Sequence, residues 1–401
     1  MDDYRWLIGD EAVPWLALAA DESVSLVARA SRLRKQLSAA RAGLVLEQVE
    51  LRRRAVEKFP QAARMFFTRK GLEQATDSWV ADYKAARFPA GEALVDLCCG
   101  IGGDLLALAL RGPIVGVDRD PVVALLAEAN LRALGRLAPG TTAAVRAEDV
   151  SELAGAEFTA WHIDPDRRPA GHRTTRVEFH DPDPAVIARW LLRCPDAALK
   201  LAPAAELPDS WGRAAEAEWI GRDRQCRQLV AWFGRLARYP GRRCATVLGR
   251  NPGGTGVSAR TVVEADGSAP PLSSGLGRYV LEPDPAVLAA GLSGVLAAEH
   301  GLAALVPGGG YLTADRPVVG DPALSCFEVL ESLPLDLKRL RQLLAARDIG
   351  TLEIKKRGVA EDPQLLRRRL GLRGSQSAVL VIAPLGSSVT AMICVRMKDE
   401  R

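Results

Sequence analysis

The strongest chemical signal in this sequence is the segment Val95–Asp104, which reads VDLCCGIGGD. An apolar strand is expected to end here in a glycine-rich turn, and a helix is expected to follow at once. Glycines let the backbone take positive φ and approach a ligand closely, and the first turn of a helix offers unpaired N–H groups. The segment therefore predicts a binding turn for a nucleotide-like ligand, with the Asp96 carboxylate beside it.

Further acidic positions narrow the expected ligand to an adenosine. Asp118 ends the next predicted strand, 22 residues after Asp96, where a carboxylate can accept both ribose hydroxyls. Glu148 and Asp149 end the third strand, where a carboxylate can accept from the adenine amino group. The alternative is a nicotinamide-binding Rossmann fold. The turn reads D-x-C-C-G-x-G-G rather than G-x-G-x-x-G, which disfavours that alternative.

The fourth predicted strand ends in residues 162–168, HIDPDRR. The carboxyl end of this strand should face the ligand crevice of a doubly wound sheet. Carboxylates there can accept a proton or orient an acceptor, and arginines can hold phosphate. Asp164, Asp166 and Arg167 are therefore the candidate catalytic residues, with a structural ion pair between Asp164 and Arg167 as the alternative.

The segment 65–76, MFFTRKGLEQAT, lies just before the first strand and is expected to cover the ligand. Gln74 and Thr76 offer side-chain hydrogen bonds. Phe66 and Phe67 either stack on a ring of the ligand or belong to the core. Lys200, on the fifth predicted strand, either lines the crevice or extends its ammonium group to the surface.

The seven cysteines are odd in number and include no C-x-x-C pair, which favours a reduced protein without a disulfide framework or a zinc site. Cys98 and Cys99 lie in the predicted binding turn, and Cys194 lies toward the other edge of the sheet. We expect none of these three to act as a nucleophile.

Positive charge is concentrated in residues 331–401, which hold 14 Lys and Arg against 8 Asp and Glu, whereas the whole chain carries a net charge of only +4. Neutralising several phosphates would give this segment a salt-sensitive affinity for nucleic acid, although a solvated helix face is the alternative. The clustered residues predicted to bind RNA are Lys355, Lys356, Arg357, Arg367, Arg368 and Arg369.

These residues must be positioned by several different kinds of element. Residues 1–90 show helical periodicity, including Leu26, Ala30, Leu33 and Leu37 at spacings of three and four. From Leu94 onward, short apolar strands alternate with helices, which predicts a parallel sheet. A Gly/Pro/Ser-rich zone near 250–278 predicts a boundary, and residues 331–401 read as a small module with the order α-β-α-β-β.

The motifs MFFTRKGLEQAT, VDLCCGIGGD, IDPDRR, LKLAP and IKKRGV together make the chain resemble a bacterial group of class I S-adenosylmethionine (SAM) dependent methyltransferases with a THUMP-like domain. The resemblance covers nearly the whole chain. It implies that SAM is the cofactor, with Asp96 and the turn at Gly100–Gly102 holding its methionine part, Asp118 its ribose and Asp149 its adenine. Cys98, Gln74 and Thr76 are further candidates for cofactor contact.

The resemblance also implies an α/β architecture: a Rossmann-like sheet with an N-terminal helical region and a C-terminal α+β region. The expected domains are 1–90 (helical), 91–250 (SAM-binding), 251–330 (linker and a small ferredoxin-like module) and 331–401 (THUMP-like). THUMP domains bind structured RNA, often tRNA, so an RNA methyltransferase is expected. The DPDRR segment departs from the D-P-P-x or N-P-P-x motif usual in nucleic-acid methyltransferases and has no aromatic residue after it, so their reaction is not transferred.

Bulk properties bound the remaining function classes. The 401 residues and 48% apolar composition suit two to four folded domains. The N-terminus lacks the pattern of a signal peptide, and no apolar run reaches about 20 residues, so a cytoplasmic protein without membrane or metal partners is expected. Two alternatives remain open: an RNA-binding protein with a non-catalytic SAM-type fold, and a methyltransferase of small molecules or proteins.

Overall fold

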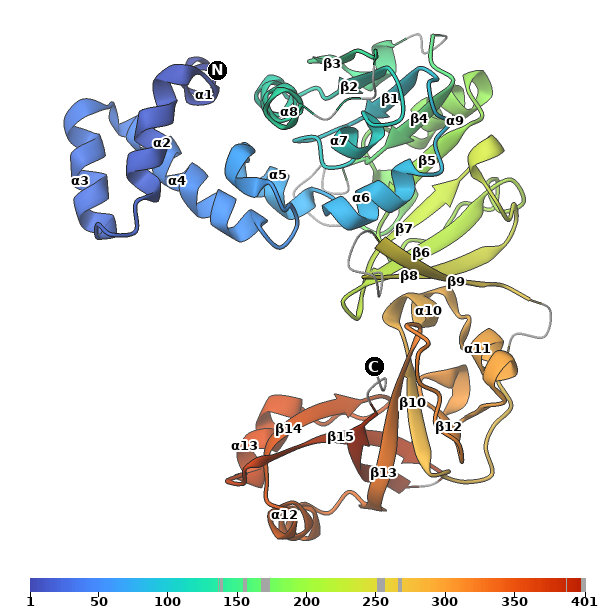
Figure 1. Ribbon diagram of the computed structural model, residues 1–401. Coiled ribbons are helices and arrows are strands. Elements are labelled where there is room, and N and C mark those ends of the chain that lie inside the picture. Colours follow the sequence, from blue (N-terminus) through green and yellow to red (C-terminus); the bar gives the residue numbers. More distant parts are fainter. Residues whose placement is uncertain are drawn as a thin grey trace. The chain divides into compact units, whose positions relative to one another are not determined.

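The computed structural model describes residues 1–397 except 136, 138–139, 154–156, 167–173, 251–256, 266–268 and 387. The chain divides into two compact units, which Figure 1 colours in chain order. Unit 1 comprises Met1–Glu216 and Leu229–Gly241, and unit 2 comprises Ala217–Gln228 and Arg242–Arg401. None of the described helices combines the length and the apolar character needed to cross a membrane.

Unit 1 begins with the predicted helical region. Its first four helices are α1 (Asp2–Ile8), α2 (Val13–Ala20), α3 (Leu26–Gln36) and α4 (Ala39–Ala55). They enclose a small apolar core that includes Leu7, Leu33 and Val45. Two further helices, α5 (Arg69–Gln74) and α6 (Ser78–Ala85), follow. Thr68 caps α5 and Asp77 caps α6 through their side-chain oxygens, which explains why each helix starts where it does.

The predicted Rossmann-like sheet is confirmed. Five parallel strands lie in the order β3-β2-β1-β4-β5, and residues 229–232 at the end of β7 add antiparallel pairing beside β5. The strands are β1 (Leu94–Leu97), β2 (Ile114–Val117), β3 (Ala143–Arg146), β4 (Ala160–Ile163), β5 (Ala197–Leu201) and β7 (Gln225–Trp232). The helices between the parallel strands are α7 (Leu105–Leu108), α8 (Pro121–Leu134) and α9 (Pro184–Arg193).

The central strands are buried along their whole length. Every residue of β1, β4 and β5 is buried, as expected for a parallel sheet covered on both faces. Because β1, β2, β3 and β4 run parallel, their carboxyl ends lie at the same edge of the sheet. The acidic residues predicted to bind the ligand must therefore meet at this edge.

Unit 2 contains β6 (Glu216–Arg222) from Ala217 onward, paired in parallel with β8 (Arg243–Arg250), which pairs with β9 (Val257–Val263). A second, seven-stranded sheet has the order β11-β12-β10-β13-β16-β15-β14. Its strands are β10 (Tyr279–Pro283), β11 (Ala303–Ala304), β12 (Leu312–Ala314), β13 (Leu324–Pro334), β14 (Ile349–Lys356), β15 (Gln376–Leu385) and β16 (Ser388–Arg396). The helices α10 (Pro285–Ala290) and α11 (Ser293–His300) lie between β10 and β11 in the sequence.

The predicted α-β-α-β-β order of the last segment is present as α12 (Leu337–Ala346), β14, α13 (Pro363–Leu370), β15 and β16. Sequence reasoning missed β13, which precedes this series and pairs along its length with β16. The expected domain boundary at residue 330 falls inside β13. Leu340 and Leu344 of α12 and Leu366 and Leu370 of α13 join one buried cluster with the strands of this sheet, so both helices cover the same apolar core.

Candidate functional site

The glycine-rich turn after β1 has the backbone geometry that the sequence predicts. Cys98, Gly100 and Gly102 have φ values of 53°, 57° and 93°. A Cβ atom at Gly103 would lie only 3.0 Å from the backbone N and O atoms of Thr76. Glycine at this position therefore allows the segment before α6 to pack directly on the turn.

Asp118 and Asp149 each hold local backbone in place. Asp118 Oδ2 accepts from the Gly100 N–H at 3.0 Å, which connects the end of β2 to the turn. Burial raises the pKa of Asp118, although hydrogen bonds from the Asp120 and Gly100 N–H groups act in the opposite direction. Asp149 Oδ1 accepts from the Ser151 hydroxyl at 2.6 Å and the Ser151 N–H at 2.8 Å, and these bonds lower the pKa of Asp149.

One cavity of about 540 Å³ connects these positions. The predicted residues that line it are Asp96, Cys98, Gly100, Asp118, Asp149, Gln74, Thr76, Asp164 and Asp166. Gly102 lies within the turn but is not among the lining residues, and Arg167 lies outside the described residues. Sequence reasoning did not single out Tyr4 of α1 or Lys70 of α5, and both line the cavity.

Negative charge dominates this cavity. Its described lining contains eight aspartates, Asp96, Asp104, Asp118, Asp120, Asp149, Asp164, Asp166 and Asp181, against the two cations Lys70 and Arg119. Arg119 forms an ion pair with Asp181 at 2.5 Å. Low-dielectric walls strengthen such a field, so the cavity is suited to a ligand that carries positive charge.

The two candidate catalytic aspartates each meet a lysine. Asp164 Oδ2 lies 2.6 Å from Lys200 Nζ, which also donates to the Gln74 carbonyl at 3.1 Å. Asp166 Oδ2 lies 3.0 Å from Lys70 Nζ. The Lys200 side chain is buried, so it does not extend to the surface, and Lys200 is not among the residues that line the cavity. The Asp164–Arg167 pair considered above involves Arg167, which lies outside the described residues.

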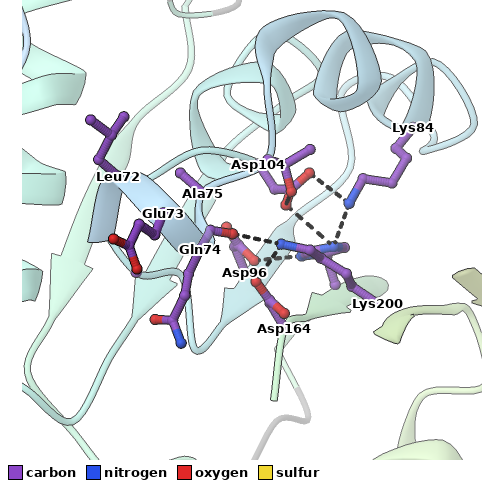
Figure 2. Close-up of polar contacts among 12 residues, drawn as sticks. Leu72, Glu73, Gln74, Ala75, Lys84, Asp96, Asp104, Asp164 and Lys200 are labelled. Atoms are coloured by element: carbon purple, nitrogen blue, oxygen red, sulfur yellow. Dashed lines mark hydrogen bonds and ion pairs between the residues drawn. The ribbon is translucent and has the colours of Figure 1, made fainter. Parts of the chain in front are cut away.

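A buried chain of polar side chains runs beneath the turn (Figure 2). Thr76 Oγ1 donates to Asp104 Oδ2 at 2.6 Å, and Lys84 Nζ lies 2.7 Å from Asp104 Oδ1. Lys84 Nζ also lies 3.1 Å from His162 Nε2, whose other ring nitrogen is 2.7 Å from Asp96 Oδ1. Asp96 Oδ2 is buried and has no hydrogen-bond partner among the described residues.

Burial and charge act against each other in this chain. Burial lowers the pKa of Lys84 and raises that of Asp96. For Asp104, burial alone would raise the pKa, but the nearby ammonium groups of Lys84 and Lys200 outweigh it and hold the pKa well below its usual range. Asp104 is therefore ionised at neutral pH.

His162 is the first residue of the HIDPDRR segment, but the sequence alone predicted no role for it. Residues Asp96 and His162 are direct partners in the parallel register of β1 and β4, so their side chains lie on the same face of the sheet. Lys84 belongs to α6 and comes close only through tertiary packing. Its position in the sequence, within a segment of helical periodicity, gave no indication of a buried role.

The comparisons with known proteins agree with this geometry. Residues 324–396 match the THUMP domain-like family. The chain is 36% identical over 371 residues, 88% of this chain and 97% of the relative, to an "uncharacterized S-adenosylmethionine-dependent methyltransferase" of Mycobacterium tuberculosis strain CDC 1551. The chain belongs to the SAM-dependent methyltransferases. The counterpart from M. tuberculosis strain H37Rv has the same identity and coverage.

A solved structure resembles this methyltransferase along almost its whole length. A candidate methyltransferase from Porphyromonas gingivalis W83 superposes with a TM-score of 0.78, covering 97% of this chain and 98% of that chain at 21% identity. That similarity concerns the fold. The fold class, the methyltransferase activity, the SAM cofactor and the presence of a THUMP-like domain are thus confirmed.

The residues of the methyltransferase cavity fit SAM. An orphaned carboxylate oxygen of Asp96 beside the glycine turn can accept from the amino group of the methionine part. Asp118 and Asp149 lie at the tips of neighbouring strands, where the sequence predicts contacts with the ribose and the adenine. When bound, SAM supplies an electrophilic methyl group on a positively charged sulfur.

The three cysteines considered as nucleophiles all have a thiol pKa above the usual value. Burial raises the pKa of Cys98 and Cys99 well above the usual value, and neighbouring aspartates add to the effect. Burial also raises the pKa of Cys194. A thiolate is the reactive form, so none of the three is suited to act as a nucleophile.

The two phenylalanines before α5 do not line the cavity. Phe67 is 2% exposed and its ring lies 6.0 Å from that of Phe59, so it belongs to the core. The Arg52 guanidinium stacks on Phe66 at 4.9 Å, and the Phe66 backbone is bonded to the Asn130 side chain. The suggestion that these rings stack on a ligand has no support in this arrangement.

The predicted RNA-binding residues occupy two different environments. On β14, Lys355 pairs with Glu282 at 2.8 Å and with Glu353 at 3.1 Å, and Arg357, the residue after this strand, pairs with Glu282 at 3.5 Å. Lys356 is exposed. On α13, Arg368 and Arg369 are exposed, whereas Arg367 is exposed but donates to the Leu352 carbonyl at 3.0 Å. The charge available to a partner is therefore greater on α13 than on β14.

Proposed function

We propose that this methyltransferase modifies RNA and that its THUMP-like domain holds the RNA backbone. The observation that carries the proposal is a basic surface on α12 and α13, the two helices that cover the THUMP-like sheet. Its exposed cations, which form no ion pair with any acidic side chain in the described part of the chain, are Lys338 and Arg339 of α12, Arg368 and Arg369 of α13, and Arg373, which follows α13.

The charge of this surface is not needed for folding. Its helices are anchored from beneath by Leu340, Leu344, Leu366 and Leu370, so the cations lie on the outer sides. Ionic contacts of exposed Lys and Arg with phosphates release counterions and give binding that weakens as salt rises. Structured RNA is therefore the partner that the surface fits.

At the cavity, Asp164 is proposed to orient the acceptor. Its Oδ2 is held by Lys200, while its Oδ1 accepts no hydrogen bond from the described residues. Transfer of the methyl group to a nitrogen or oxygen acceptor forms the new C–N or C–O bond as the sulfur–methyl bond breaks. The acceptor's proton then leaves, and Asp164 or Asp166 is placed at the cavity wall to accept it. Alignment of the two reacting groups supplies much of the rate.

Binding of bulk tRNA across a salt series tests the RNA partner. We expect the double variant Arg368→Glu/Arg369→Glu to weaken tRNA binding and to reduce the slope of log K against log salt by about 2, because two phosphate contacts are lost. The matched control is Arg53→Glu/Arg54→Glu, an equal change of charge at the last turn of α4. Equal weakening by both variants, or tRNA binding that does not depend on salt, would contradict the proposal.

Nucleoside mass spectrometry tests the modification itself. RNA from a deletion strain should lack one methylated nucleoside, and the purified protein with SAM should restore it. An unchanged nucleoside profile in the deletion strain counts against an RNA substrate and favours a small-molecule or protein acceptor.

A further inference from the structure

The buried polar chain beneath the cofactor turn ends at an oxygen without a partner. The Asp96 side chain is 1% exposed, its Oδ1 lies 2.7 Å from His162 Nδ1, and its Oδ2 makes no hydrogen bond within the part of the chain that the structure describes. A buried acceptor without a donor costs free energy that a bound ligand can recover. Asp96 is among the residues that line the cavity, so a ligand in the cavity would lie next to this residue.

The charges around Asp96 do not cancel. The ionisable groups packed against it are His162 from β4, Lys84 from α6, and Asp104 from the turn before α7. The carboxylates of Asp96 and Asp104 face the single ammonium group of Lys84, and a neutral His162 leaves this set with one negative charge in excess. Lys200 and Asp164 form a separate pair close by and balance each other. A cationic donor is therefore the ligand group that this position favours.

The direction of the hydrogen bonds follows from the chemistry of the lysine. A charged Lys84 has donors only, and its contact with Asp104 at 2.7 Å favours the charged form. His162 Nε2 must then accept from Lys84, so the ring proton must lie on Nδ1. His162 Nδ1–H consequently donates to Asp96 Oδ1, which fixes the carboxylate and leaves Oδ2 as its oxygen without a donor among the described residues.

We propose that Lys84 and His162 are positioning residues for the amino group of SAM. Lys84 sets the tautomer of His162, His162 orients Asp96, and Asp96 Oδ2 accepts from the cofactor's ammonium group. This inference depends on the cofactor assignment and is independent of the RNA substrate, so it can fail while the proposed function stands, and the reverse.

Two ligands that differ in the methionine part provide the test. S-adenosylhomocysteine carries the amino group, whereas methylthioadenosine keeps the adenosine and sulfur and lacks it. We expect His162→Leu to weaken S-adenosylhomocysteine binding by about tenfold to a hundredfold, the usual effect of losing a hydrogen bond to a charged group. Methylthioadenosine affinity should change by less than about twofold, because the adenosine contacts at Asp118 and Asp149 are untouched.

The matched variant is His162→Asn, whose side-chain amide can replace Nδ1–H as donor to Asp96. We expect it to keep S-adenosylhomocysteine affinity much closer to that of the unmodified protein. Calorimetric titration of both ligands gives the affinities. Equal loss for both ligands would indicate a structural role and overturn the inference, as would unchanged binding in His162→Leu or equal losses in the Leu and Asn variants.

A measurement on the unmodified protein covers the case in which His162→Leu does not fold. Nitrogen NMR of histidine-labelled protein distinguishes protonated from unprotonated ring nitrogens, and only four histidines need assignment. We expect His162 to carry its proton on Nδ1, with Nε2 unprotonated. A proton on Nε2 would exclude donation from Lys84 and overturn the inference.

Discussion

Replacing Lys84 by methionine removes one partner of a buried ion pair while keeping the volume of the side chain. The Lys84 and Asp104 side chains are 2% and 8% exposed, and their charged atoms are 2.7 Å apart. At an effective dielectric constant of about 20, such a pair is worth about 6 kcal/mol before desolvation is counted. Loss of one partner from a buried pair typically costs about 3–5 kcal/mol, because the other charge is left buried and uncompensated. We expect Lys84→Met to lower the free energy of unfolding of unit 1 by that amount.

The pH dependence gives this prediction a second signature. In the unmodified protein the pKa of Asp104 is depressed, so the stability it contributes is present at neutral pH and is lost as pH falls through that low pKa. In Lys84→Met, burial without the ammonium group should raise the pKa of Asp104 above its unfolded value. The variant's deficit should therefore shrink as pH falls from 7 to about 4, because the carboxyl becomes protonated.

Urea unfolding followed by tryptophan fluorescence at several pH values measures both effects. Lys70→Met is the control, because its pair with Asp166 has a lysine that is 64% exposed and should contribute within about 1 kcal/mol. The double variant Lys84→Met/Asp104→Asn, which removes both charges, should recover much of the lost stability. A deficit in Lys84→Met below about 1 kcal/mol, or one that does not vary with pH, would refute this account.

Three further predictions concern ligand binding and transfer. Asp118→Ala should weaken S-adenosylhomocysteine binding about tenfold, measured by calorimetry, because it removes the carboxylate and releases the Gly100 N–H; unchanged affinity would remove Asp118 from the cofactor site. Asp164→Asn should lower methyl transfer to RNA at least tenfold while S-adenosylhomocysteine affinity stays within about threefold, because the change affects acceptor placement; equal loss of both would assign Asp164 to the cofactor. Lys58→Met should weaken cofactor binding although Lys58 does not contact the cofactor, because Lys58 Nζ donates to the carbonyls of Leu72, Glu73 and Ala75 at the end of α5. Calorimetry measures the affinity, and an unchanged affinity would show that α5 keeps its place without this lysine.

The parts of the site that could be predicted are those fixed by local sequence. The acids at the ends of β1, β2 and β3 lie around one cavity because parallel strands bring their carboxyl ends to the same edge, a rule that needs no knowledge of packing. The glycine turn could also be predicted from local sequence. The positive φ at Gly100 and Gly102 is a local backbone requirement, and glycine is the residue type that meets it most easily.

The parts that could not be predicted depend on distant packing. Lys84 contacts His162 across 78 residues of sequence, and Lys70 contacts Asp166 across 96. Nothing in a helical periodicity distinguishes a buried lysine from an exposed one. The sequence also could not predict that the charges of Lys355 and Arg357 are neutralised, because Glu282 lies on another strand and pairs with them only in the folded sheet. β13 was missed because its exposed and buried residues alternate irregularly around a bulge between Val329 and Glu331.

The excess of carboxylates in the cavity has a consequence for turnover. The sulfur of SAM carries a positive charge that disappears when the methyl group leaves, whereas Asp96, Asp118 and Asp149, the aspartates predicted to hold the cofactor, exchange no proton in the transfer. The electrostatic part of the binding free energy therefore falls at the moment the reaction is complete. The same walls that draw the charged donor in hold the spent, uncharged thioether less strongly, which favours its exchange for a fresh molecule.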